Sequence, residues 1–283
     1  MKIIVDAFGG DNAPLEIMKG CADAVAEYGI DVMLVGPQEE IKKTAREYNI
    51  SLNRMEIVHA PQVLTMEDHP GEVVKSKKDC SMAEGLRRLA AGEGDAFVSA
   101  GNSGALVVGA RLIVKRIKGI QRVGFAPIMP KSNGCFMLID SGANVQCRAE
   151  QLQQFGVMGS IYMERVMKVK NPRVGLANVG TEEHKGDDLR HEAFALLKQS
   201  PIHFIGNIEA RDIPVDAADV VVADGFSGNL ILKLYEGVAM TLMGKIKDIL
   251  TKNAKTKIAA ALILSNMKEL KKQMGYNEYG GAP

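Results

Sequence analysis

Short runs of apolar, mostly β-branched residues recur along the chain. Most are followed by a glycine-rich or polar loop and then by a helical pattern. These runs predict strands at residues 3–5, 32–35, 55–58, 96–99, 123–128, 135–139, 174–179, 203–208 and 220–223. The runs are almost wholly apolar rather than alternating, which is typical of parallel strands buried on both faces. The pattern therefore predicts an α/β fold with three layers and a mostly parallel sheet, in which residues 123–128 and 135–139 form adjacent strands.

Two signals indicate where helices begin. Pro14 suits the first position of a helix after the first strand. Ser81 and Glu84 have the spacing of a capping box, which predicts the start of a helix around residues 86–91.

The pattern changes near the C-terminus, where the strands stop and apolar residues recur at helical spacing from about residue 240 to 276. Acidic residues are few in this segment, and lysines stand at positions 245, 247, 252, 255, 257, 268, 271 and 272. We expect two helices, joined near residues 253–256, that protrude from a single α/β domain spanning residues 1–283.

Composition narrows the class of protein. The net charge of the 283 residues is +1, so the overall charge does not indicate a nucleic-acid partner. The apolar run at residues 1–6 is too short for a signal peptide, and no stretch reaches the ~18 apolar residues of a membrane span. We therefore expect a cytoplasmic protein. The four cysteines form no CxxC pair, so a zinc or redox site is not expected. We expect neither a metal nor a cofactor.

Two loops echo each other, at residues 99–106 (SAGNSGAL) and 223–230 (ADGFSGNL), each between an apolar strand and an apolar helix. Small residues let the backbone approach a ligand closely, and N–H groups at a helix start face an anion. Neither loop fits GxxxxGK[ST], GxGxxG or GxSxG, which disfavours a nucleotide hydrolase, a dinucleotide enzyme and a serine hydrolase. The loops predict phosphate binding. The alternative is a tight strand-to-helix turn without a ligand.

Four further loops follow strands, at residues 6–11, 140–144, 178–186 and 206–212. Lys185 could reach a phosphate as a mobile charge or be a solvated surface lysine. Asp6 and Asp11 could cap the following helix or hold polar donors in place.

Taken in order, these loops resemble those of the phosphate acyltransferases of bacterial phospholipid synthesis, the PlsX family. The resemblance rests on residues 6–14 (DAFGGDNAP), 99–105, 140–144, 178–186, 206–212 and 224–229, and so spans essentially the whole chain. Phe8 and Asn12 stand where the family commonly has Met and His. Residues 279–282 (YGGA) also match, and because family members continue beyond this motif, we expect a C-terminal part that this sequence lacks.

The resemblance implies acyl transfer from acyl-carrier protein to inorganic phosphate, giving an acyl phosphate for phosphatidic acid synthesis. It also implies a fold like that of isocitrate and isopropylmalate dehydrogenases, and a homodimer. The resemblance further implies that the enzyme acts close to the membrane, or close to a membrane acyltransferase that uses its product. Phosphate is itself the nucleophile in this reaction, so no protein nucleophile is needed. Loop N–H groups, Asn amides and a Lys would hold the dianion and the developing oxyanion.

On this basis we expect three catalytic residues, Asn102, Lys185 and Asn229. The residues expected to bind substrate or phosphate are Asp6, Gly9, Gly10, Asp11, Gly101, Ser103, Gly104, Asn144, Asn178, Gly180, Gly186, Asn207, Asp224 and Gly228.

Alternatives stay open at this point. The enzyme could be a phosphotransacetylase that uses acyl-coenzyme A, a dehydrogenase of the same fold, or a non-catalytic lipid-surface or regulatory module. The lysine-rich helices could pack in a dimer, meet the acidic carrier protein, or lie on anionic lipid. We place dimer packing first and lipid contact second.

Overall fold

The structure, a computed structural model, describes residues 1–274 and 282. The end of the lysine-rich segment at residues 275–276 and most of the YGGA motif lie outside the described residues. The chain divides into two compact units, Met1–Gly119 and Ile120–Pro283. That residues 1–283 form a single domain stays a prediction.

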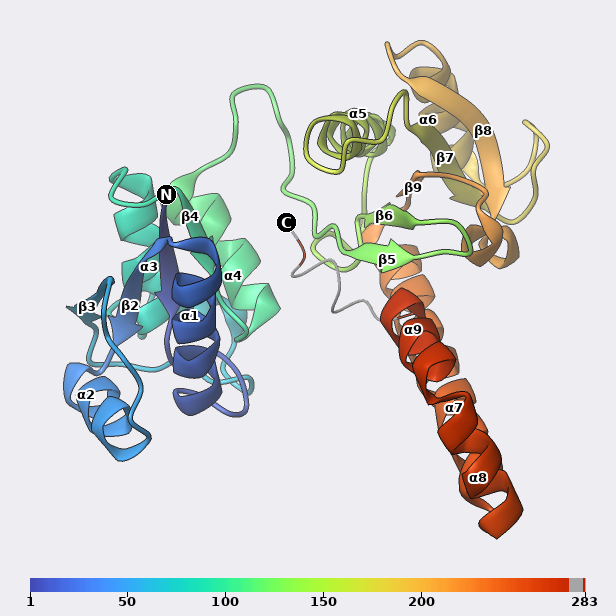
Figure 1. The fold of residues 1–283 in the computed structure, drawn as a ribbon. Coiled ribbons are helices and arrows are strands. Elements are labelled where there is room, and N and C mark those ends of the chain that lie inside the picture. Colours follow the sequence, from blue (N-terminus) through green and yellow to red (C-terminus); the bar gives the residue numbers. More distant parts are fainter. Residues whose placement is uncertain (275–281, 283) are drawn as a thin grey trace. The chain divides into compact units, whose positions relative to one another are not determined.

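The first unit is built on a parallel four-stranded sheet of order β3-β2-β1-β4 (Figure 1). Its elements are β1 (Lys2–Asp6), α1 (Leu15–Tyr28), β2 (Asp31–Gly36), α2 (Gln38–Glu47), β3 (Met55–His59), a 3-10 helix (Pro70–Val74), α3 (Ser81–Ala90), β4 (Ala96–Val98), α4 (Ser103–Gly109) and a π-helix (Ala110–Val114).

Helices cover both faces of this sheet. On one face Met18 of α1 and Ile41 of α2 pack with Val5 and Leu34. On the other face Leu89 of α3 and Phe97 pack against a buried cluster that includes Ile4 and Met33. Successive side chains of β1 and β2 point to opposite faces of the sheet, and helices cover both faces. The unit therefore has three layers, as the apolar runs predict.

The second unit holds a five-stranded sheet of order β5-β6-β9-β7-β8, in which only the β5–β6 pair is antiparallel. Its elements are β5 (Ile128–Pro130), β6 (Cys135–Ile139), α5 (Ala149–Arg165), β7 (Arg173–Asn178), α6 (Asp188–Lys198), β8 (His203–Glu209), a 3-10 helix (Ala210–Val215), β9 (Val220–Val222), α7 (Gly225–Thr251), α8 (Ala254–Leu262) and α9 (Leu264–Met274). The prediction of an α/β protein dominated by parallel strands is confirmed, with the strands divided between two sheets.

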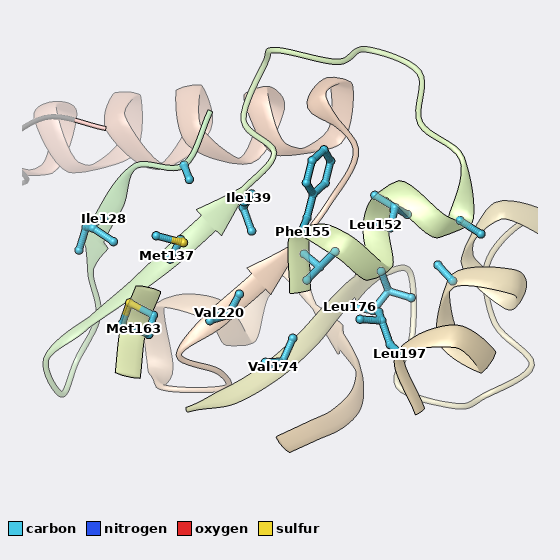
Figure 2. Packing of buried hydrophobic residues seen from close by; sticks show 14 residues of the cluster. Ile128, Met137, Ile139, Leu152, Phe155, Met163, Val174, Leu176, Leu197 and Val220 are labelled. Atoms are coloured by element: carbon cyan, nitrogen blue, oxygen red, sulfur yellow. The ribbon is translucent and has the colours of Figure 1, made fainter. Parts of the chain in front are cut away.

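The main core of the second unit lies between this sheet and helices α5 and α6. Phe155 and Leu152 of α5, Leu197 of α6 and the sheet residues Val174 and Val220 belong to one buried cluster (Figure 2). On the opposite face Leu232 and Tyr235 of α7 pack against a cluster around Phe136 and Val221. This unit therefore also has three layers.

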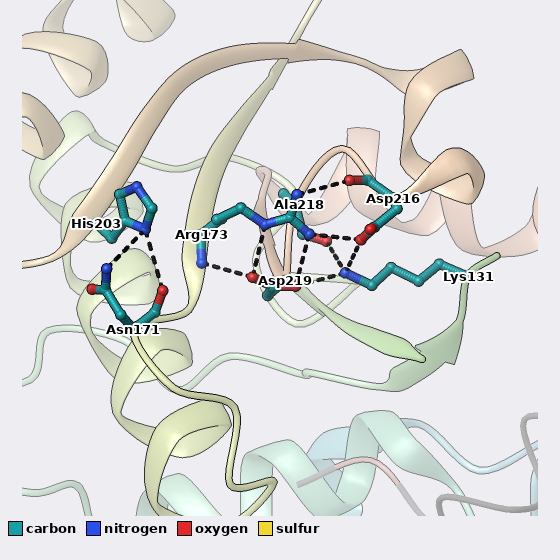
Figure 3. Close-up of polar contacts among 7 residues, drawn as sticks. All are labelled: Lys131, Asn171, Arg173, His203, Asp216, Ala218 and Asp219. Carbon is teal, nitrogen blue, oxygen red and sulfur yellow. Dashed lines mark hydrogen bonds and ion pairs between the residues drawn. The ribbon is translucent and has the colours of Figure 1, made fainter. Parts of the chain in front are cut away.

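A network of ion pairs lies at the amino-terminal edge of the second sheet (Figure 3). Lys131, which is 8% exposed, donates to Asp219 Oδ1 at 2.6 Å and forms an ion pair with Asp216. Arg173 also binds both carboxylates. Burial alone would raise the pKa of Asp219, but the hydrogen bonds from Arg173 and Lys131 outweigh it and hold the pKa well below the ordinary 3.8.

Two sequence-based predictions are wrong in detail. Residues 123–127 run beside β6 without forming a regular strand. Asp140 accepts from the N–H of Phe125, Asn144 donates to Val123 O, and Pro127 has no N–H to donate to a ladder. The two predicted strands are adjacent and pair as a hairpin, but the first begins at Ile128. The helix near residue 86 begins at Ser81, and its cap is the Cys80 sulfur, which accepts from the N–H of Ala83.

The predicted turn near residue 253 is confirmed, although α7 already begins at Gly225. Helices α7, α8 and α9 run together away from the five-stranded sheet (Figure 1). Between residues 233 and 269, where side chains are described, none is buried. No helix in the described part of the chain is both long and apolar enough to cross a bilayer.

Candidate active site

Asp6, at the end of β1, organises the carboxyl-terminal edge of the first sheet. Its carboxylate is 3% exposed and accepts from Ser99 Oγ at 2.8 Å and from the N–H of Phe8 at 3.2 Å. Ser99 Oγ in turn accepts from the N–H of Gly101 at 3.1 Å. Burial raises the pKa of Asp6 above 3.8, against hydrogen bonds from Ser81 and Ser99 that lower it. Asp6 therefore holds the loop after β4 to the loop after β1.

The two loops meet through glycines. A Cβ on Gly9 would lie 2.6 Å from Ser99 Oγ and 2.8 Å from the nitrogen of Gly101. A Cβ on Gly10 would lie 3.2 Å from Ala100 O, and its φ is +107°. The double glycine after β1 is therefore needed for this close approach.

Asn102 caps α4. Its Oδ1 accepts from the N–H of Ala105 at 3.0 Å, and its Nδ2 donates to Asp68 O at 3.0 Å. Gly104 packs beneath Pro70, while Ser103 is exposed at the first position of the helix. The Asn102 amide thus has protein partners on both sides, whereas Ser103 has an exposed polar side chain.

The segment from Val63 to Asp68 forms a braced wall beside these loops. Lys77 Nζ donates to Val63 O at 3.0 Å and to the Asp68 carboxylate, which also accepts from the N–H of Thr65 at 2.6 Å. The hydrogen bond from Lys77 lowers the pKa of Asp68 to about 2. Together with the loop after β1, this segment surrounds a cavity of about 470 Å³. The cavity is lined by Phe8, Gly10, Asp11, Ala13, Val63, Leu64, Thr65, Met66, Glu67 and Gly101.

In the second unit, Asp140 organises the loop after β6. The side chain is fully buried and accepts from the N–H groups of Phe125 at 2.9 Å and Asn144 at 2.6 Å. Asn144 Nδ2 binds both Asp140 and Val123 O. The sequence-based list omitted Asp140, although an Asp directly after an apolar strand and before Ser-Gly was a usable signal.

The start of α7 packs against this loop. Asp224 caps the helix by accepting from the N–H groups of Phe226 at 3.1 Å and Ser227 at 2.9 Å, and the N–H of Gly225 donates to Asn144 O. A Cβ on Gly228 would overlap the carbonyl oxygen of Asp140. The sequence analysis predicted that the N–H groups of this loop bind phosphate, but these N–H groups already have protein acceptors.

Arg190 links the starts of α6 and α7. Its guanidinium forms an ion pair with Asp224 and donates to Ser227 Oγ at 3.0 Å and to Asp187 Oδ2 at 2.9 Å. Sequence reasoning missed Arg190, because only the fold brings it to a residue 34 positions away.

Two asparagines hold the turn that carries Lys185. Asn178 Nδ2 donates to Lys185 O at 3.0 Å, and Asn207 Nδ2 donates to Glu182 O at 2.9 Å. Gly186 has φ +99°, and Gly180 lies against the Lys185 stem. The Lys185 side chain is exposed, and no described residue pairs with its ammonium group. Asn207 is 5% exposed, and its Oδ1 has no hydrogen-bond partner among the described residues.

The predicted site residues thus form two sets, each at the carboxyl-terminal edge of its own sheet. The first unit brings together Asp6, Gly9, Gly10, Asp11, Gly101, Asn102, Ser103 and Gly104. The second brings together Asn144, Asn178, Gly180, Lys185, Gly186, Asn207, Asp224, Gly228 and Asn229. Asn229 lies beside Gly142, is exposed, and has no described partner for its amide. Among the described residues, no group of three or more His, Cys, Asp or Glu side chains could hold a metal ion.

Comparisons with known proteins identify the family of the chain. A family model described as "Fatty acid synthesis protein" matches residues 1–283. The chain is 46% identical over 283 residues to a phosphate acyltransferase of Alkaliphilus oremlandii, covering all of this chain and 84% of the relative. The identity to a phosphate acyltransferase of Clostridium novyi is 45% over 283 residues, covering all of this chain and 85% of the relative.

Two solved structures with a similar fold are phosphotransacetylases. EutD phosphotransacetylase from Staphylococcus aureus has a TM-score of 0.62 at 17% identity, covering 84% of this chain and 82% of that one. The Streptococcus pyogenes phosphotransacetylase has a TM-score of 0.65 at 17% identity, covering 85% and 82%. At this identity the likeness shows the fold alone, whereas the whole-chain matches show that the protein belongs to the fatty acid synthesis family that includes the phosphate acyltransferases.

Proposed function

We propose that the protein transfers the acyl group of an acyl-carrier-protein thioester to inorganic phosphate, for the synthesis of phosphatidic acid. A phosphate oxygen attacks the thioester carbonyl, the carbon–sulfur bond breaks, and the carrier leaves as a thiolate that takes up a proton. The observation that carries the proposal is the match over the whole chain to proteins named phosphate acyltransferase.

The state of three of the four cysteines supports phosphate as the direct nucleophile. Burial raises the pKa of the Cys21 and Cys147 thiols to about 11, and burial also raises the pKa of Cys80. The reactive thiolate is therefore scarce near neutral pH.

We propose that Lys185 and Asn229 contact the phosphate. Both are exposed, both follow adjacent strands of one sheet edge, and neither has a described partner for its polar group. Asn144 and Asn178 have protein partners for their amides, so in this proposal they position the loops. Ser103 is the corresponding exposed candidate in the first unit.

We also propose that the protein is a cytoplasmic homodimer that pairs through the helices α7 to α9. Large apolar side chains at Leu230, Leu234, Val238 and Leu242 recur every four residues of α7, and each is more than half exposed. The same stripe on a second copy of the chain would bury these side chains. Contact of the lysine-rich helices with anionic lipid, or with a membrane acyltransferase that consumes the product, is the second proposal for this surface.

Release of free thiol tests the proposed donor. Acyl-carrier protein and acyl-coenzyme A with the same chain are each incubated with the protein, with and without phosphate. We expect phosphate-dependent thiol release that is faster from the carrier protein. Preference for coenzyme A would favour a phosphotransacetylase, and release from neither donor would favour a non-catalytic module.

A further inference from the structure

The cavity of about 470 Å³ in the first unit has no assigned occupant. We propose that it binds the acyl chain of the thioester donor. This inference rests on the proposed function and assigns one part of the substrate to one place in the chain.

The walls of the cavity suit a hydrocarbon chain. Phe8 and Ala13 come from the loop after β1, and Val63, Leu64 and Met66 come from the braced segment opposite. Leu64 is 5% exposed, whereas Met66 is 57% exposed, so the wall extends from the core to the surface. Covering such apolar surface with an acyl chain is favourable, and the flexible Met66 side chain adapts to chain shape.

The charges around the cavity argue against phosphate as its occupant. Asp11 and Glu67 are the ionisable residues in its lining, and none of the lining residues, all of them described, is a lysine or arginine. Lys77 stands on the same braced segment, but its ammonium binds Asp68 and Val63 O. Two carboxylates would repel a phosphate dianion, whereas an acyl chain carries no charge.

The cavity adjoins the loop of Ser103, the candidate for phosphate contact in the first unit. Gly101 belongs both to the cavity wall and to the loop of residues 99–105. An acyl chain in the cavity therefore lies beside that loop. The hydrogen bonds from Gly101 to Ser99 and from Ser99 to Asp6 keep this part of the wall in place.

The test compares palmitoyl and butyryl thioesters on the same carrier protein. Met66→Asp places a charge on the apolar wall at an exposed position, where the fold tolerates it. We expect the ratio of kcat/KM for palmitoyl over butyryl donor to fall by about tenfold or more, since a charge in an apolar pocket loses its hydration. Met66→Leu, which keeps an apolar side chain, should retain most of the wild-type ratio.

Tyr48→Asp is the matched control. Tyr48 is 50% exposed and follows α2, whose end lies at the opposite edge of the sheet from the loop after β1. Its ratio should equal that of the wild type. Equal ratios in Met66→Asp and Tyr48→Asp would overturn the inference.

A binding measurement separates this inference from the proposed function. The fluorescence of parinaric acid, an 18-carbon polyene fatty acid, reports its burial without any acyl transfer. We expect the dissociation constant to rise by about tenfold in Met66→Asp and not in Tyr48→Asp. The same affinity in both variants would count against the cavity, whether or not the protein releases thiol from any donor.

Glu67→Lys tests the competing occupant. If the cavity bound phosphate, adding a cation to its rim would lower the KM for phosphate. We expect this KM to be unchanged, and a clear decrease would assign the cavity to phosphate instead.

Discussion

At the scale of single residues, the hydrogen bonds of the asparagine side chains distinguish residues that hold the backbone from residues that can contact a ligand. The sequence predicted a site rich in asparagine, and the glycine loops are where it predicted them. Asn102, Asn144 and Asn178 use their amides to hold neighbouring backbone, however. The sequence could not reveal this for Asn102 and Asn144, because their acceptors lie in other segments that only the fold brings close. For Asn178 the acceptor lies in its own loop, and the path of that turn decides the contact. Lys185 and Asn229 stay available by the same criterion.

The most specific prediction for a single residue concerns Lys185. Lys185→Ala should raise the KM for phosphate by about tenfold to a hundredfold, the range for losing a hydrogen bond to a charged group. Steady-state kinetics with varied phosphate measures this. Lys170→Ala, an exposed lysine just before β7 at the opposite edge of the sheet, serves as the control. An unchanged KM in Lys185→Ala would remove Lys185 from the site.

Gly228 and Gly237, both on α7, form a matched pair. A Cβ on Gly228 would overlap Asp140 O, whereas a Cβ on Gly237 would have no neighbour within 4 Å. Gly228→Ala should lower the free energy of unfolding by about 1–3 kcal/mol or more. Gly237→Ala should raise it by up to about 1 kcal/mol, because alanine favours helix. Urea denaturation measures both, and equal effects would contradict the close packing at Gly228.

At the scale of elements, the apolar runs predicted the strands and most of the helices. Where the prediction and the structure differ, hydrogen bonds of particular residues explain the difference. Residues 123–127 are apolar enough for a strand, yet Asp140 and Asn144 bind their backbone. Cys80 rather than Ser81 caps α3, because Ser81 lies one residue inside the helix and hydrogen-bonds Asp6. Sequence periodicity reports which face is buried, but it does not report which side chain satisfies a backbone group.

The ion network of Lys131, Arg173, Asp216 and Asp219 joins the hairpin to β7 and β9. Lys131→Met should lower the free energy of unfolding by about 3–5 kcal/mol, because it leaves the buried Asp219 and the partly buried Asp216 with one cation fewer. Urea denaturation near neutral pH measures this. A loss below about 1 kcal/mol would show that the network is dispensable.

The same network predicts a dependence on pH. Lowered pKa values of Asp216 and Asp219 stabilise the folded state above the ordinary value of 3.8, and this contribution is lost as the pH falls below it. Stability should therefore drop between about pH 5 and about pH 2. The drop should be smaller in Lys131→Met, and an equal drop in both proteins would contradict the assignment.

At the scale of the whole molecule, the sequence indicated parallel α/β layers but not their division between two sheets. The register of strands far apart in sequence decides that division, and local patterns do not contain it. The helices α7 to α9 expose an apolar stripe that a second copy would cover. Light scattering should find a dimer for the wild type and a monomer for Leu234→Glu. Lys247→Gln, with the same change of charge on the opposite face of α7, should stay dimeric, and a dimeric Leu234→Glu would contradict the proposal.

The central claim is that phosphate itself attacks the acyl donor. Intact-protein mass spectrometry of the protein mixed with acyl-carrier protein tests it most directly, first without phosphate and then with it. The account predicts an unmodified protein in both cases, and acyl phosphate in amounts equal to free carrier protein only when phosphate is present. An acyl adduct on the protein that phosphate then removes would contradict it.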